Sequence, residues 1–133
     1  LTIFKEAEDA IKLAPASNTY TTRAWLSGGV GVQLHNQLGQ TATYAINVQE
    51  AGYYDIAVKY VAWDFDNTAR AFAINGVSYV IPLPRTIDYG TVPESWKYVV
   101  GDTNIYLEPG EYVLSIEAME GSWNYDYLGL IKR

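Results

Sequence analysis

Acidic side chains near the two ends of the sequence are the first candidates for chemistry. Glu6 and Glu8 stand two residues apart in "FKEAEDA", and Asp126 lies between two tyrosines in "NYDYLGL". Side chains two positions apart on a strand point to the same face. If the first and last strands are neighbours in a sheet, Asp126 meets the two glutamates there. Crowded carboxylates either raise a carboxyl pKa sharply or bind a cation.

Calcium is the cation that these residue types favour. Ca²⁺ takes about six to eight oxygen ligands and accepts main-chain carbonyls, which the loop "AWLSGGVG" can supply. The sequence has no cysteine and one histidine, His35. Thiolate sites and multi-histidine zinc centres are therefore excluded, and His35 is expected to be structural or at the surface. The same spacing also fits a solvated strand face, with the aspartate at a turn or an edge.

The residues between these ends form a succession of predicted strands. Segment 54–62, "YDIAVKYVA", alternates apolar with polar or small residues, as a half-buried strand does. Asn75-Gly76 predicts a tight hairpin turn because both residues tolerate positive φ, and Pro109-Gly110 predicts a second turn. Further strands are expected at residues 2–8, 42–48, 96–107 and 124–131. Helical signals are confined to one or two turns before Pro15.

This pattern predicts an all-β fold, a β-sandwich of the jelly-roll class. Strands that recur about every ten residues, with turn residues between them, are typical of that class. The 133 residues are expected to form one domain, 1–133. Segments 14–29 and 82–95 lack alternation and are predicted to be long loops, where function is usually carried.

Charge and hydropathy exclude several classes of partner. Nine basic and fifteen acidic side chains give a net charge of −6 without a basic run, which repels nucleic acid and anionic lipid. No apolar run approaches the roughly 20 residues that a membrane helix needs. Twelve Tyr and four Trp stand against three Phe, and such amphipathic rings suit wet recognition surfaces.

An acid pair would be the basis of an enzymatic alternative. Glycoside hydrolases use two carboxylates, and Asp64 with Asp66 or Glu94 offers such a pair in a small hydrolase or lyase. Fifteen acidic residues make a close pair expected by chance. Release of reducing sugar by the purified chain would favour this alternative.

Several segments, taken in order, resemble the carbohydrate-binding modules of families 6 and 35. They are "EAED", "SGG" before an alternating strand, "YDIAVKYV", "INGV", a Trp ahead of "IYLEPGEYVLSI", and the terminal "NYDYLGL". The resemblance covers nearly the whole chain. Its most diagnostic part is the Glu-x-Glu start combined with the Asn-x-Asp-Tyr end.

The resemblance implies a galactose-binding-like jelly roll with a structural calcium and a sugar site in the loops at one end. The implied calcium ligands are Glu6, Glu8 and Asp126, with a loop oxygen from Ser27. In the sugar site, Asn124 hydrogen-bonds a hydroxyl and Trp96 stacks on a pyranose ring.

The sequence departs from family 6 at Val30, where relatives often carry a second aromatic residue. Trp63, Tyr89 and Trp123 are the replacement stacking rings that the sequence offers.

The resemblance further implies a non-catalytic, extracellular, monomeric module that is tethered to a glycoside hydrolase acting on plant polysaccharide. The charge of −6 favours neutral β-mannan or galactomannan, because only Arg70 and Arg85 lie near the candidate loops to attract an acidic polymer. The alternative within the family is a uronic-acid-binding module with a second calcium in the ligand site, where bound Ca²⁺ overrides the net charge.

Overall fold

Strands dominate the computed structural model, which describes residues 2–14, 20–34 and 39–133. Within these ranges the strands form two antiparallel sheets. The first contains β1 (Ile3–Glu6), β3 (Tyr20–Thr22), β4 (Val30–Leu34), β6 (Gly52–Ala62), β9 (Lys97–Val100), β10 (Ile105–Leu107) and β12 (Trp123–Lys132). The second contains β2 (Lys12–Ala14), β5 (Thr41–Val48), β7 (Ala69–Ile74), β8 (Val77–Pro82) and β11 (Gly110–Glu117). Three short 3₁₀ helices accompany them: η1 (Ala7–Asp9), η2 (Ser27–Gly29) and η3 (Pro93–Ser95).

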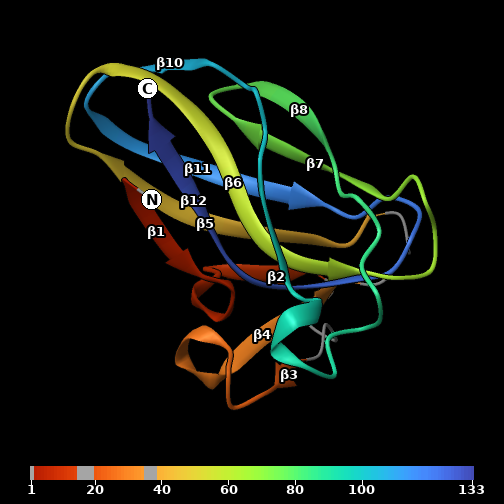
Figure 1. Cartoon of the computed structure of the whole chain (residues 1–133). Helices are drawn as coiled ribbons and strands as arrows, with labels where there is room; N and C mark the ends of the chain where they lie inside the picture. Colours follow the sequence, from red (N-terminus) through yellow and green to blue (C-terminus); the bar gives the residue numbers. More distant parts are fainter. Residues whose placement is uncertain (1, 15–19, 35–38) are drawn as a thin grey trace.

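The seven-stranded sheet has the order β10-β6-β12-β4-β3, with β1 beside β12 and β9 beside β6. The five-stranded sheet has the order β2-β5-β11-β7-β8. Figure 1 shows the long strands β6 and β12 lying across β5, β11 and β7. In the described residues, no helix is long and apolar enough to cross a membrane. The predicted all-β sandwich is confirmed.

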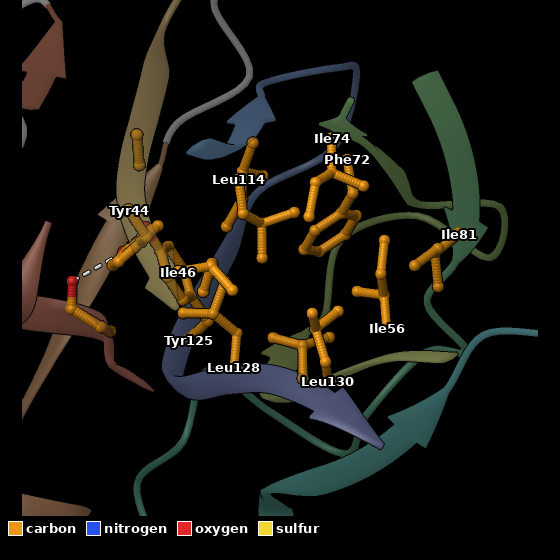
Figure 2. Close-up of a cluster of buried hydrophobic side chains, with 14 of the residues drawn as sticks. Tyr44, Ile46, Ile56, Phe72, Ile74, Ile81, Leu114, Tyr125, Leu128 and Leu130 are labelled. Atoms are coloured by element: carbon orange, nitrogen blue, oxygen red, sulfur yellow. Dashed lines mark hydrogen bonds between the residues drawn. The ribbon is translucent and has the colours of Figure 1, made fainter. Parts of the chain in front are cut away.

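Apolar side chains on the inner faces of the two sheets form one core (Figure 2). Tyr44 and Phe72 come from the five-stranded sheet, and Leu128 comes from the other. The hydroxyl of Tyr44 donates to the Ala7 carbonyl at 2.7 Å and lies 2.6 Å from the Tyr125 hydroxyl. Tyr44 thereby ties η1, which carries Glu8, to both sheets, because a buried hydroxyl needs a partner.

Two local predictions from sequence are confirmed. Asn75 and Gly76 have φ of 54° and 78° and join β7 to β8, as a two-residue hairpin turn requires. The first and last strands are neighbours, and the register pairs Glu6 with Tyr127. Asp126 therefore lies beside the end of β1.

Other elements differ from the prediction. Segment 96–107 is two strands rather than one, because the Asp55 carboxylate accepts the backbone N–H groups of Thr103 at 3.1 Å and Asn104 at 2.9 Å and draws the chain out of the sheet. The predicted helical turns before Pro15 are one 3₁₀ turn followed by β2. The predicted loop 14–29 contains β3 and η2, and His35 lies outside the described residues.

Candidate functional site

The three carboxylates predicted to meet are gathered around η2. The backbone N–H of Ser27 donates to Oδ2 of Asp126 at 3.2 Å, and the Ser27 hydroxyl donates to Oε1 of Glu6. A Cβ at Gly28 would lie 2.8 Å from Oε2 of Glu8, and Gly28 has φ of 66°. Glycine is therefore required there twice, for the left-handed backbone and for the close approach of the glutamate.

Each of these carboxylates has one oxygen that receives no hydrogen bond from the described residues. Within the part of the chain that the structure describes, Oε2 of Glu6, Oε1 of Glu8 and Oδ1 of Asp126 are buried without a hydrogen-bond partner. Burial raises the pKa of Asp126 to about 6, and the nearby charge of Glu6 acts in the same direction. Burial also raises the pKa of Glu8, where the charges of Glu6 and Asp126 add to the effect. A cation would relieve both penalties.

The donor set here consists of hard oxygens, which fits Ca²⁺. Among the described residues, no group of three acidic, histidine or cysteine side chains is placed so that it could hold a metal ion. An ion at this place would therefore need oxygens from the η2 segment in addition to those of Glu6, Glu8 and Asp126.

Four of the five predicted sugar-binding residues lie together where β6 and β12 approach the loop after β8. The rings of Trp63 and Tyr89 are 6.0 Å apart between centroids, at an interplanar angle of 65°. The side-chain amide of Asn124 donates to the Tyr89 carbonyl at 3.4 Å. Trp63 also packs against the small cluster that contains Trp96. We call Trp63, Tyr89, Trp96 and Asn124 the loop site.

Trp96 is not the open stacking ring that the resemblance implied. Its side chain is 7% exposed and packs with Leu26 and Val61. The Gly90 backbone lies on the indole, since a Cβ there would stand 2.8 Å from Cζ2, and the indole N–H donates to the Gly90 carbonyl at 3.3 Å. Trp96 is the floor of the loop site, and Tyr89, at 51% exposure, is its open ring.

Trp123 was wrongly predicted as a stacking ring. It is 1% exposed and belongs to the main core, where it stacks on Tyr125 at 4.5 Å and 18°. The Arg70 guanidinium lies 5.1 Å from its ring centroid. Arg70 is itself buried and donates to the backbone carbonyls of Ala69 and Gly121, so this arginine does not face a ligand at the loops.

The loop that carries Tyr89 is held by side chains that the sequence reasoning did not identify. The Asp88 carboxylate accepts the Gly90 N–H at 2.8 Å, and the hydroxyl of Thr91 at 2.6 Å. The Thr91 hydroxyl contributes most to holding the pKa of Asp88 at about 2. Thr86 anchors the other side of the loop through its hydroxyl, which lies 2.9 Å from the Ala62 carbonyl. The segment "DYG" carries the sequence signal, because Asp commonly bonds backbone groups two residues on.

The acidic residues of the enzymatic alternative are engaged in local contacts. Asp64 accepts the Ser122 N–H at 2.9 Å, and Asp66 pairs with Arg85 at 3.2 Å. Arg85 also donates through Nε to the Trp63 carbonyl at 2.9 Å. These contacts position the loop of residues 63–68 beside the loop site.

No family model and no curated protein matches the sequence. Solved structures do match. The family 35 carbohydrate-binding module from Clostridium thermocellum has a TM-score of 0.77 and 19% identity, over 96% of this chain and 96% of that chain. The family 6 module CBM6cm-2 from Cellvibrio mixtus lichenase 5A, in complex with cellotriose, has a TM-score of 0.72 and 20% identity, over 98% and 96%.

A third match is the Podospora anserina GH26-CBM35 β-(1,4)-mannanase, with a TM-score of 0.75 and 21% identity. It covers 98% of this chain, which spans only 27% of the mannanase. The chain has the fold of these modules. The fold that the sequence resemblance implied is therefore confirmed.

Proposed function

We propose that the chain is a non-catalytic carbohydrate-binding module that binds neutral β-linked polysaccharide at the loop site. The observation that carries this proposal is the exposed Tyr89 ring, which stands 6.0 Å from the Trp63 ring while the backbone carbonyl of Tyr89 accepts a hydrogen bond from the buried amide of Asn124. This arrangement combines an apolar ring face with an oriented polar group, the pairing that a sugar requires.

Each part of the loop site has a separate role in this proposal. The C–H face of a pyranose packs on the aromatic rings, while the Asn124 side chain offers both a donor and an acceptor to sugar hydroxyls. The small cluster that contains Trp96 supports Trp63. A shallow, wet site gives weak binding, with a Kd of roughly 10 µM to 1 mM. Tethering to a catalytic domain in an extracellular enzyme would make that affinity sufficient.

Charge at the loop site supports a neutral ligand, with β-mannan or galactomannan first. The net charge of −6 repels an acidic polymer. Of the two arginines near the loops in sequence, Arg70 is buried and Arg85 pairs with Asp66.

We further propose a structural Ca²⁺ at the carboxylates around η2. The ion would be held by Glu6, Glu8 and Asp126 with Ser27, and it would supply the positive charge that their buried oxygens lack. Its expected role is to join β1, η1, η2 and β12, since these elements carry the ligands.

Affinity electrophoresis of the purified chain through gels that contain mannans, xylans, pectins or uronic-acid polymers tests the proposed function. We expect retardation by mannan, loss of retardation in Tyr89→Ala, and no release of reducing sugar from any gel polymer. Retardation by uronic-acid polymers alone, abolished by a chelator, would show that the uronate alternative is right. Hydrolysis would show an enzyme.

A further inference from the structure

Aromatic side chains also gather on the outer face of the seven-stranded sheet, away from the core. Phe4, Tyr53, Tyr98 and Tyr106 lie there with exposures between 45% and 51%. Tyr127, on the central strand β12, contacts two of these rings. Together these five residues are named the outer aromatic face. Exposed rings that cluster on one face mark an interaction surface more often than scattered ones do.

Strand register places the rings in rows. Tyr98, Lys59 and Tyr127 are aligned across β9, β6 and β12. The Tyr98 and Tyr127 centroids are 6.2 Å apart, and Phe4 follows at 5.1 Å from Tyr127. Tyr53 and Tyr106 form a second pair, with centroids 5.2 Å apart, where β6 meets β10.

The outer aromatic face is continuous with the loop site. Trp96 and Tyr98 stand two residues apart along the sheet edge, and Trp96 packs on Val61, which faces the same side of β6 as Lys59. From Val61 to Tyr53 is eight residues, or about 26 Å at about 3.3 Å per residue. One sugar unit cannot span this length, whereas a polymer chain can.

Charged groups on this face contact neighbouring side chains, and Arg133 forms ion pairs. Arg133 pairs with Asp55 at 3.0 Å and with Asp102. The Lys59 ammonium lies 6.0 Å from the Tyr127 centroid, and Glu108 accepts the Tyr106 hydroxyl at 3.0 Å. A surface of exposed aromatic rings, with ring hydroxyls and an internally paired arginine at its rim, complements an uncharged, amphipathic partner.

We propose that the outer aromatic face is a second carbohydrate-contact surface, which takes a neutral polysaccharide chain as it leaves the loop site along β6 and β9. This inference rests on the proposed function of the loop site. Its consequence is that the chain binds long or insoluble polysaccharide more tightly than short oligosaccharides, since only the polymer reaches Tyr98, Phe4 and Tyr53.

The test compares two ligands and three sets of variants. Binding to insoluble β-mannan is measured by depletion, and binding to mannotriose by calorimetry. The outer-face variants are Tyr98→Ala and Tyr106→Ala, and Tyr89→Ala removes the open ring of the loop site. Val80→Ala is the matched control, because Val80 is an exposed strand residue on the outer side of the five-stranded sheet.

We expect each outer-face variant to weaken mannan binding by about three- to tenfold, as the loss of one aromatic contact does. Mannotriose binding should stay unchanged in both variants, and Val80→Ala should match the wild type with both ligands. Mannan binding unchanged in both Tyr98→Ala and Tyr106→Ala, with wild-type far-ultraviolet circular dichroism, overturns the proposal. So does a wild-type dimer that these variants convert to monomer, because the surface then joins two copies.

The same measurements distinguish a wrong loop-site proposal from a wrong proposal for the outer aromatic face. If the wild type binds mannan but not mannotriose, and Tyr89→Ala has no effect while Tyr98→Ala does, the loop-site proposal is wrong and the outer aromatic face is supported. If Tyr89→Ala abolishes binding of both ligands and Tyr98→Ala and Tyr106→Ala change neither, only the loop site binds sugar.

Discussion

A buried carboxylate next to other carboxylates is an unfavourable arrangement without a counter-charge. Asp126 shows it, with Oδ1 unpaired within the described residues and a pKa of about 6 against an ordinary value of 3.8. Proteins retain such a group where a ligand restores its charge balance.

Stability of the calcium-free chain should fall as pH rises from about 4 to about 6. Because the pKa of Asp126 is higher in the folded state than in the unfolded state, the folded state binds more protons in this window, and stability declines with rising pH. Thermal midpoints of the wild type and Asp126→Asn, measured with chelator between pH 4 and 7, check this. The wild type should lose more stability than the variant across the window. Parallel profiles would contradict the assignment.

Substitutions of Trp123 and Tyr89 should affect different properties: Trp123→Ala should lower stability, and Tyr89→Ala should weaken sugar binding. Trp123→Ala opens a core cavity and should lower the free energy of unfolding by about 3–5 kcal/mol. Tyr89→Ala removes an exposed ring and should change it by about 0.5 kcal/mol or less, while weakening sugar binding strongly. Denaturant unfolding and calorimetric titration of both variants check the pair. A large loss of stability in Tyr89→Ala would show that this ring serves the fold instead.

At the scale of elements, the loop of residues 83–96 holds the open ring through the Asp88 turn. We predict that Asp88→Ala weakens oligosaccharide binding by about fivefold or more, because Gly90 and Tyr89 lose their fixed backbone. Glu94→Ala changes an exposed acid in the same loop and is the control. Equal affinities in the two variants would show that the turn does not position Tyr89. Titration with mannotriose measures the difference.

An element can be predicted from the sequence where its structure depends on neighbouring residues alone. Asn75-Gly76 predicts its hairpin because the turn depends on those two residues alone. Segment 96–107 was predicted as one strand because its interruption depends on Asp55, a distant residue in the sequence.

Some candidate site residues could be placed from the sequence, and others could not. Asp126 was expected beside Glu6 on the condition that the first and last strands are neighbours, and the register of β1 with β12 meets that condition. Trp123 and Asn124 are adjacent in sequence but face opposite sides of β12, so ring type alone did not show which residue faces the core. A bulge between Tyr125 and Tyr127 also changes the alternation that a regular strand would predict.

For the whole molecule, bound calcium is expected to stabilise the fold by linking β1, η1, η2 and β12. A ligand at a hundred times its Kd stabilises the folded state by about 2.7 kcal/mol, so a strong chelator should lower the thermal midpoint by several degrees. Asp126→Ala should resemble the chelated wild type and respond little to chelator. A wild-type midpoint that chelator does not change, after metal analysis has confirmed removal, would exclude the calcium site.

Binding of neutral polysaccharide at the loop site is tested by calorimetric titration of the wild type, Tyr89→Ala and Val80→Ala with β-mannan oligosaccharides. We expect saturable binding by the wild type and by Val80→Ala, with a Kd of roughly 10 µM to 1 mM, and no measurable binding by Tyr89→Ala. Absence of binding by the wild type, or undiminished binding by Tyr89→Ala, would contradict it.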